Sequence, residues 1–316
     1  PKVAPASAGG GAGDGEEQEE EEDEPFDPRE AMEPVDLLGK LPKTEFAAKL
    51  AEAKWSEKVA GIQIAIDIIG PLPKLAAGDY GDLVRQFKRL GETHSHVQVA
   101  LSSFRLLSLL AEGLGPGFSP YCRSVLGAML GKLRDKKFVS ALGECMDRMY
   151  GNPVSLDQVL DEVVAAMDGK KNPVHARLAV YEWLARCVAK KTPATDVATL
   201  AALAKAVSAS LADSDPKVRE GSCNAMVAIV NASNRGTKGQ VWAVVAELEN
   251  TNARVYKKIK VAVSAAPAAP ESRPSSRPPA KGAQGGPPPS SATSAAPSKT
   301  AAVTEAAADA RPPSAP

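Results

Sequence analysis

Turn-forming residues recur along the middle of the chain at intervals of about 40 residues. Between them the apolar residues follow helical spacing, and the alternation typical of strands is almost absent. A repeat of this length is typical of helical hairpins, which stack because no single hairpin can bury its apolar face alone. The expected turns lie near Trp55, Ser95, Lys136, Asn172 and Asp215, which are separated by 40, 41, 36 and 43 residues.

This spacing predicts one all-α solenoid of six HEAT-type helical hairpins over residues 34–263. The sixth hairpin is expected to be shorter, with helices over Thr237–Leu248 and Ala253–Lys260. Apolar residues at helical spacing support this prediction. The three clearest apolar stripes are Val59, Ile62, Ile66 and Ile69; Leu83, Phe87 and Leu90; and Leu200, Leu203, Val207 and Leu211.

Capping patterns predict where three of the helices begin. Ser155 with Gln158 has the spacing of a capping box. Asn172-Pro173 and Asp215-Pro216 each place a capping residue directly before a proline at the first helical position.

The charge of the chain is unevenly distributed, although 38 basic and 38 acidic residues balance. Residues 1–33 contain 12 acidic and 2 basic residues, residues 254–316 contain 9 basic and 3 acidic ones, and the segment between them carries a net charge of +4. Residues 1–33 and the Pro/Ala/Ser/Gly-rich residues 264–316 have too little apolar surface to offset their chain entropy. We therefore expect a disordered acidic linker at 1–33 and a disordered basic linker at 264–316. Because the sequence begins with Pro1 and both ends resemble linkers, we expect a segment of a longer protein.

Two classes of protein are excluded by composition. No apolar run approaches the roughly 18 residues of a membrane-spanning helix, and no secretory signal is present, so we expect an intracellular protein without membrane contact. The four cysteines are far apart and lie within helical patterns, so they are expected to be reduced and buried: Cys122, Cys145, Cys187 and Cys223.

The sequence contains no recognisable catalytic or metal-binding motif. Of the three histidines only His94 and His96 are close together, and neither Cys nor a carboxylate lies at a spacing that would complete a metal site with them. The segment GLGPG at 113–117 lacks the strand and the Lys-Ser/Thr of a phosphate-binding loop, which indicates a turn between repeats. We therefore expect a non-enzymatic binding scaffold without a metal or cofactor.

The turns of stacked hairpins line up along one edge, and here they are rich in basic and polar residues. Each second helix should also direct the positive end of its dipole toward this edge, which favours an acidic partner. The turn segments are KWSEK (54–58), HSHV (94–97), RDKK (134–137), KKNP (170–173) and DSDPKVR (213–219).

Two turn residues have alternative interpretations at this point. Trp55 lies between charged neighbours, where it is either an exposed interface anchor or a cap folded onto the first hairpin. Arg219 either contacts a partner or ties neighbouring repeats together through a carboxylate. Trp183 and Trp242 lie within helices and are expected in the core.

These segments resemble the TOG domains of the conserved multi-TOG microtubule polymerase family, and most closely the second TOG domain. The resemblance covers about residues 34–262, and its most specific part is the combination of the KW turn with the D-x-x-P-x-V-R turn. The segments that carry it are LPKTEFAAKLAEAKWSEKVAGI, KLAAGDYGDLVRQFKRL, KLRDKK, MDGKKNP and DSDPKVRE.

The resemblance implies a flat paddle of six HEAT repeats that binds the curved, unpolymerised αβ-tubulin dimer through its turn-bearing edge. Trp55 would be the hydrophobic anchor, with Ser95 and His96 in the second turn. Later turns would contribute Lys136 and Lys137, Lys171 and Asn172, and Lys217 with Arg219. The implied role is delivery of tubulin to a growing microtubule end in the cytoplasm or spindle, with the basic tail attracted to the acidic lattice.

Three hypotheses remain open on sequence alone. The first is a tubulin-binding TOG module, monomeric as a domain. The second is a generic HEAT scaffold whose partner is not tubulin. The third, nucleic-acid binding through the basic tail, ranks last because the tail lacks interleaved aromatic residues.

Overall fold

A computed structural model describes residues 31–151, 153–190, 195–233 and 238–265. Within these ranges the chain is helical and forms no β-strand, apart from isolated bridges between Val35 and Leu75 and between Tyr150 and Val154. The two predicted linkers lie outside the described residues, except for residues 31–33 and 264–265.

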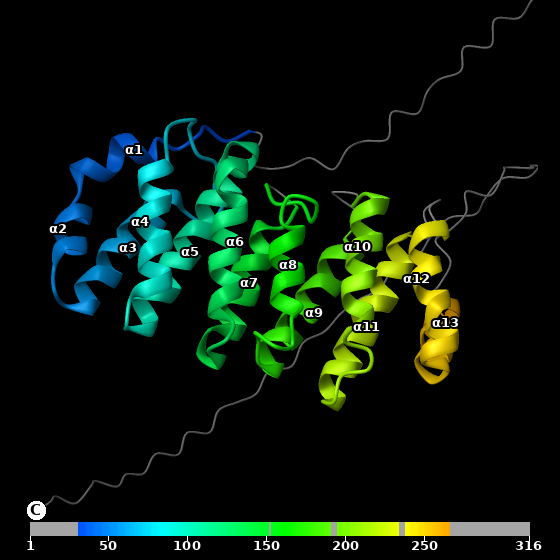
Figure 1. Ribbon diagram of the computed structural model, residues 1–316. Coiled ribbons are helices and arrows are strands. Elements are labelled where there is room, and N and C mark those ends of the chain that lie inside the picture. The colour runs from blue at the N-terminus through cyan, green and yellow to red at the C-terminus, as the bar shows by residue number, and fades with distance from the viewer. Residues whose placement is uncertain (1–30, 152, 191–194, 234–237, 266–316) are drawn as a thin grey trace, which may run out of the picture. The chain divides into compact units, whose positions relative to one another are not determined.

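The described chain forms six helical hairpins in a row, as the spacing predicted (Figure 1). A short α1 (Leu37–Lys40) and the 3₁₀ turn η1 (Leu41–Lys43) precede them. The first helices of the hairpins are α2 (Phe46–Ala51), α4 (Gly81–Thr93), α6 (Ser119–Lys132), α8 (Leu160–Met167), α10 (Val197–Ser208) and α12 (Lys238–Thr251). The second helices are α3 (Trp55–Ile69), α5 (Val97–Leu114), α7 (Val139–Met149), α9 (Val174–Ala189), α11 (Pro216–Ser233) and α13 (Ala253–Ala265).

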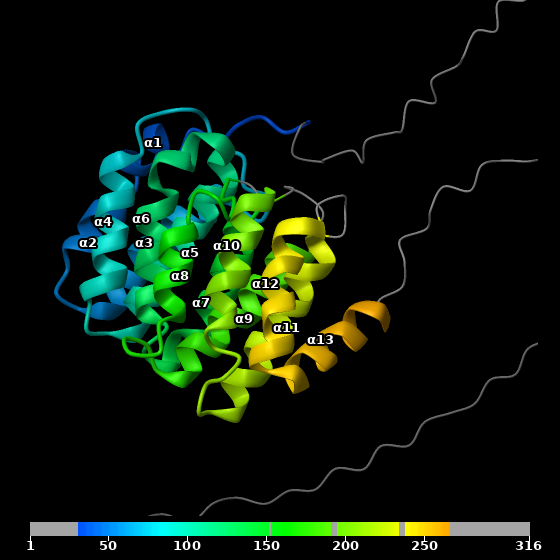
Figure 2. The same cartoon turned by 45° about the vertical axis from the view of Figure 1, so that its right-hand side comes forward.

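The hairpins stack into two layers of helices. Each second helix packs on the second helix of the next hairpin, from α3 through α13, and from α4 onward the first helices pack on one another in the same way. Figure 2 shows the two layers side by side, with α13 at the end of the row. One continuous core lies between the layers, because each hairpin buries its apolar stripe against its neighbours.

The core confirms most of the predicted stripes. Leu200, Leu203, Val207 and Leu211 are buried, whereas in α4 the buried line runs through Val84 and Phe87, and Leu83 and Leu90 flank it. Trp183 is buried and packs edge-to-face with the Tyr150 ring, with the two ring centroids 6.3 Å apart. Trp242 is partly buried and packs against the core. All four cysteines are free and buried.

Three predictions about helix boundaries were wrong, and one of them, the cap at Asn172, is described with the turns below. The sixth hairpin is not shorter, because α12 has 14 residues and α13 has 13, and the stripe of Val241, Val245 and Leu248 continues the core. The capping box at Ser155 does not form, and α8 begins only at Leu160. Before it, Gly151 donates to the carbonyl of Val154 in a closed loop that buries Val154, and turns follow up to residue 159.

Contrary to the expectation from the sequence, one helical stretch, Val97–Lys132, is long and apolar enough to cross a membrane by length and composition. In the structure it comprises α5, the 3₁₀ turn η2 (Gly115–Phe118) and α6, which include the GLGPG turn. The apolar residues of α5 are mostly buried in the core, which accounts for its hydropathy.

The contact between α4 and α5 depends on a glycine. Gly91 is buried in α4, and a Cβ atom placed there would lie 2.7–2.9 Å from three atoms of the Phe104 ring. Phe104 is itself fully buried, so its ring has little room to move.

Gly91→Ala should therefore lower the free energy of unfolding by about 1–3 kcal/mol, because the added methyl group overpacks the core. Gly131→Ala, in α6, is the matched control, since a Cβ there meets nothing within 4 Å. It should be neutral or stabilise by up to about 1 kcal/mol through helix propensity. Urea unfolding of both variants measures this, and a destabilisation of equal size in both would contradict the packing argument.

Candidate protein-binding edge

The turns between the two helices of each hairpin lie along one edge of the row, the lower edge in Figure 1. We call residues 52–58, 94–97, 134–138, 168–174, 213–219 and 252–254 the turn edge. The second helices begin here, so their N-terminal dipoles add partial positive charge to it. The alignment of the turns was expected from their spacing in the sequence.

The first two turns are joined by an aromatic stack. The rings of Trp55 and His96 are nearly parallel, with centroids 3.9 Å apart and an interplanar angle of 9°. Trp55 is nevertheless 47% exposed, so it is not a closed cap on the first hairpin. It lies against the second turn and keeps about half of its surface available.

The second turn also contains the exposed Ser95 and an internal hydrogen bond. The backbone N–H of His96 donates to Nδ1 of His94 at 3.0 Å, while Nδ1 of His96 is buried without a partner. In the first turn, Lys58 Nζ donates to the carbonyl of Leu50 at 2.6 Å, which fixes the start of α3 against the end of α2.

The third turn exposes two lysines. The Asp135 side chain accepts from the backbone N–H of Lys137 and caps the 3₁₀ turn η3 (Lys136–Phe138). Phe138 is buried and anchors the turn, whereas the neighbouring Lys136 and Lys137 are exposed to solvent.

Side-chain hydrogen bonds connect the fourth turn to the third. Asn172 is only 8% exposed, and its Oδ1 accepts from Arg134 Nε at 3.0 Å while its Nδ2 donates to the Ala165 carbonyl at 2.9 Å. His175 Nε2 lies 2.8 Å from the Arg134 carbonyl. Asn172 therefore connects turns, and it does not cap α9, which begins at Val174. Lys171 beside it is exposed, 3.7 Å from Asp168.

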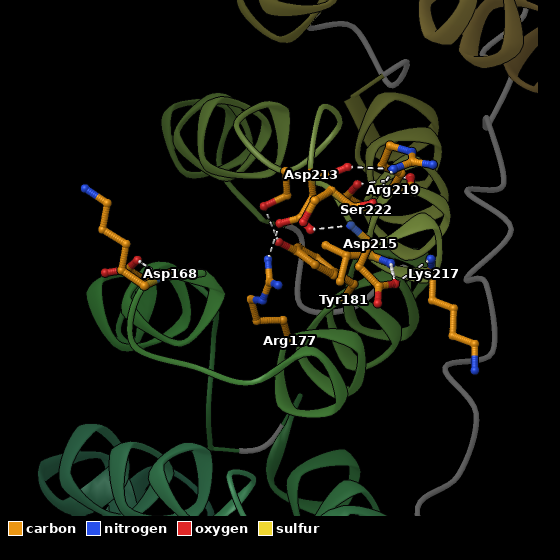
Figure 3. A network of polar contacts seen from close by, with 12 residues as sticks. Asp168, Arg177, Tyr181, Asp213, Asp215, Lys217, Arg219 and Ser222 are labelled. Atoms are coloured by element: carbon orange, nitrogen blue, oxygen red, sulfur yellow. Dashed lines mark hydrogen bonds and ion pairs between the residues drawn. The ribbon is translucent and has the colours of Figure 1, made fainter.

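A nearly buried ion pair joins the fourth hairpin to the fifth turn. Arg177 Nη1 donates to Asp213 Oδ2 at 2.6 Å, and the two side chains are 7% and 18% exposed. The Arg177 guanidinium and a backbone N–H hold the pKa of Asp213 below its ordinary value. Figure 3 shows Tyr181 close to the Arg177–Asp213 pair. Burial raises the pKa of Tyr181, and its protonated hydroxyl donates to Ser210 Oγ at 2.6 Å.

The fifth turn has the predicted cap. Asp215 Oδ1 accepts from the backbone N–H groups of Lys217 and Val218, at 2.8 and 3.3 Å, so α11 begins at Pro216 as expected. Arg219 Nη1 donates to the carbonyls of Asp213 and Ser214, at 2.7 and 2.9 Å. Both Lys217 and Arg219 remain exposed.

The repeat-linking arginine is thus Arg177, which sequence reasoning missed, and not Arg219. Each is the fourth residue of its helix, in VHAR and PKVR, so the two positions are equivalent. Arg177 meets a carboxylate in the next turn, whereas the turn that follows Arg219, residues 252–254, contains no carboxylate. Arg219 therefore bonds within its own turn. This shared register was the sequence signal that could have identified Arg177.

Comparison with known proteins gives a match over most of the folded region. Residues 43–237 match the family model described as CLASP N terminal. The chain belongs to the CLASP N-terminal family. The match ends before α12, so the sixth hairpin lies beyond it.

Individual relatives agree with this assignment. Protein mini spindles of Drosophila melanogaster is 31% identical over 210 residues, which are 66% of this chain and 10% of that protein. A solved structure from work on microtubule plus-end tracking by XMAP215, CLIP-170 and EB1 is 27% identical, with a TM-score of 0.62, and the match covers 72% of this chain and 93% of the other. The Drosophila Mini spindles TOG3 structure, 14% identical with a TM-score of 0.54 over 70% of this chain and 92% of that one, supports the fold.

The helical region is therefore a TOG domain of the microtubule polymerase family, as its motifs predicted. Its closer likeness to the second TOG domain stays a prediction. The chain spans about a tenth of the length of Mini spindles and of several other relatives that it matches.

Asp213→Asn should lower the stability of this TOG domain by about 1.5–3 kcal/mol at pH 7, because Arg177 loses its charged acceptor. Since the folded pKa of Asp213 is depressed, the contribution is complete above the ordinary pKa of 3.8 and is lost as the pH falls through the lower, folded value. The difference between wild type and variant should therefore shrink only below about pH 4.

Urea unfolding at pH 7, 5, 3.5 and 2.5 tests this expectation. Asp82→Asn is the control, because Asp82 pairs with Arg85 at the surface, where the two side chains are 97% and 77% exposed. This control should unfold like the wild type at every pH. A stability difference for Asp213→Asn that stays constant down to pH 2.5 would contradict the assigned role of the ion pair.

Proposed function

We propose that this TOG domain binds the curved αβ-tubulin heterodimer through its turn edge, as one non-enzymatic module of a microtubule polymerase or plus-end regulator. The observation that carries the proposal is the alignment of one half-exposed tryptophan with a series of exposed cations along a single edge. Family membership supports the partner, because structures with this fold come from work on tubulin recruitment by TOG domain arrays.

Trp55 is the proposed hydrophobic anchor. Stacking on His96 holds the indole ring in one orientation, so little side-chain freedom remains to be lost on binding. Its exposed surface is available to a partner, and tryptophan is among the residues that most often dominate interface energies. Ser95 and His96 would complete this first contact region.

The later turns supply charge for an acidic partner surface. Lys136, Lys137, Lys171, Lys217 and Arg219 are all exposed on the turn edge. Asn172 differs from them, because its burial assigns it the role of holding the third and fourth turns in register. Rim charges of this kind chiefly accelerate association and set its salt dependence.

The proposed mechanism is tethered delivery. The domain would hold a curved tubulin dimer near a growing microtubule end, and straightening of the dimer in the lattice would release it. Residues 266–316 of the basic tail lie outside the described residues, and we propose that they associate with the acidic lattice without a fixed structure. This role places the protein on cytoplasmic and spindle microtubules, in keeping with relatives named for spindles and centrosomes. The domain itself would act as a monomer.

Trp55→Ala in the full chain should remove the anchor and weaken tubulin binding by about 2–4 kcal/mol, enough to abolish co-elution from a gel-filtration column. Leu72→Ala is the matched control, because Leu72 is also 47% exposed but lies after α3, away from the turn edge. It should co-elute with tubulin as the wild type does.

Circular dichroism of both variants should match the wild type, since neither side chain is buried. If Trp55→Ala still co-elutes with tubulin, the anchor assignment is wrong. If the wild-type chain does not shift with unpolymerised tubulin, the domain is a HEAT scaffold for a different partner.

A further inference from the structure

A groove of about 620 Å³ opens between α11 and α13 where both helices begin. Figure 2 shows these two helices side by side at the end of the row. The volume lies in the range of roughly 300–1,000 Å³ that is typical of ligand sites. The groove is lined by Leu211, Pro216, Arg219, Glu220 and Cys223 on one side and by Asn252, Arg254, Val255 and Lys258 on the other.

The groove has an excess of positive charge. Arg219, Arg254 and Lys258 line it together with a single carboxylate, that of Glu220. Helix α13 contains four basic residues and no acidic one. Within the described ranges, none of these four takes part in an ion pair, although Lys260 lies over the ring of Tyr256.

The position of the hairpin explains this excess. Elsewhere, an arginine of one repeat meets a carboxylate of the adjacent repeat, and the pairs are Arg123 with Asp161 and Glu162, Arg148 with Glu112, Arg177 with Asp213, and Arg186 with Asp147. The sixth hairpin is the last in the described chain, so no described repeat follows it to supply carboxylates. A ligand for this groove should therefore provide carboxylates itself.

We propose that the groove between α11 and α13 binds the acidic segment EEQEEEEDE, residues 16–24 of this same chain, with residues 16–20 in the groove itself. This segment carries eight carboxylates in nine residues, which is the charge complement that the groove lacks. No aromatic residue lines the groove, so it offers no surface on which nucleic-acid bases could stack.

The segment can reach the groove within one molecule. Val35 pairs with Lys74, and Leu75 with the carbonyl of Gly113, which places the start of the described chain beside the end of α5. Three helix spacings of about 10 Å and one helix length of about 20 Å separate this point from the groove, or roughly 35–40 Å in total. An extended chain spans roughly 36–40 Å from Ala31 back to Glu20 and roughly 50 Å back to Glu16. Residues 16–20 can therefore enter the groove, and residues 21–24 would lie along the path to it.

Docking of residues 16–24 would also cover Arg219, which belongs to both the groove and the turn edge. If the proposed tubulin-binding role holds, the acidic segment would compete with the partner for the fifth turn. Because the acidic segment is tethered to the domain, its effective concentration at the groove is high even when its intrinsic affinity is weak.

The test uses a fluorescent peptide of residues 14–25 and the full chain in two backgrounds, wild type and a variant whose acidic residues at 16–24 are all replaced by Gln or Asn. Fluorescence anisotropy at low salt should show the peptide binding to the neutralised variant. The wild type, whose own segment occupies the groove, should bind it at least ~5-fold more weakly.

Adding Arg254→Glu and Lys258→Glu to the neutralised variant should weaken peptide binding at least ~10-fold. Lys257→Glu and Lys260→Glu form the matched control, because they make the same charge change on the same helix but do not line the groove. This pair should change binding by no more than about 2-fold. Thermal unfolding confirms that each variant is folded.

Equal weakening by both pairs would overturn the proposal, because it would show attraction to net charge and not to the groove. Equal peptide affinity in the wild type and the neutralised variant would overturn it as well, since the segment would then not occupy the groove. Tubulin is absent from these measurements, so their failure leaves the proposed tubulin-binding role untouched.

Discussion

The fold depends on packing between successive hairpins, because a pair of helices with one apolar face each cannot form a core alone. Small residues allow close contacts both between and within hairpins. A Cβ at Gly221 of α11 would lie 3.0 Å from Leu178 of α9 in the preceding hairpin, and within the second hairpin Gly91 of α4 lies directly against the Phe104 ring of α5. Such contacts set the position of each helix along its axis relative to its neighbour. The turns that begin the second helices are therefore brought to a common edge.

Polar contacts then hold neighbouring turns in register. The stack of Trp55 on His96 joins the first turn to the second, Asn172 joins the third to the fourth, and Arg177 with Asp213 joins the fourth hairpin to the fifth turn. These side chains are partly or fully buried, while the lysines between them are exposed. The edge thus combines a framework of bonded side chains with exposed charges, an arrangement that suits electrostatic recognition of a large charged surface.

Charge is organised by the same stacking. Arginines inside the row are neutralised by carboxylates of adjacent repeats, whereas the basic residues of α13 have no such partner in the part of the chain that the structure describes. The zero net charge of the chain therefore conceals a basic surface in the folded domain and an acidic segment at its N-terminal side. The proposed docking of residues 16–24 would connect the two and make access to the fifth turn depend on competition.

Sequence periodicity by itself determined the class of fold, the number of hairpins and the edge on which the turns lie, because helical stripes and capping residues are local properties of the chain. It also correctly assigned Asp215 as a cap, whereas it left two alternatives for Trp55, between which the exposure in the structure decides. The tertiary structure decided which turn residues are exposed to a partner and which are hydrogen-bonded to other parts of the domain. Asn172 and Arg177 are held by residues 36–38 positions away, and Arg219 bonds locally because the next turn offers no carboxylate. Such partners depend on the register of one repeat against the next, which packing of side chains sets and a single sequence does not display.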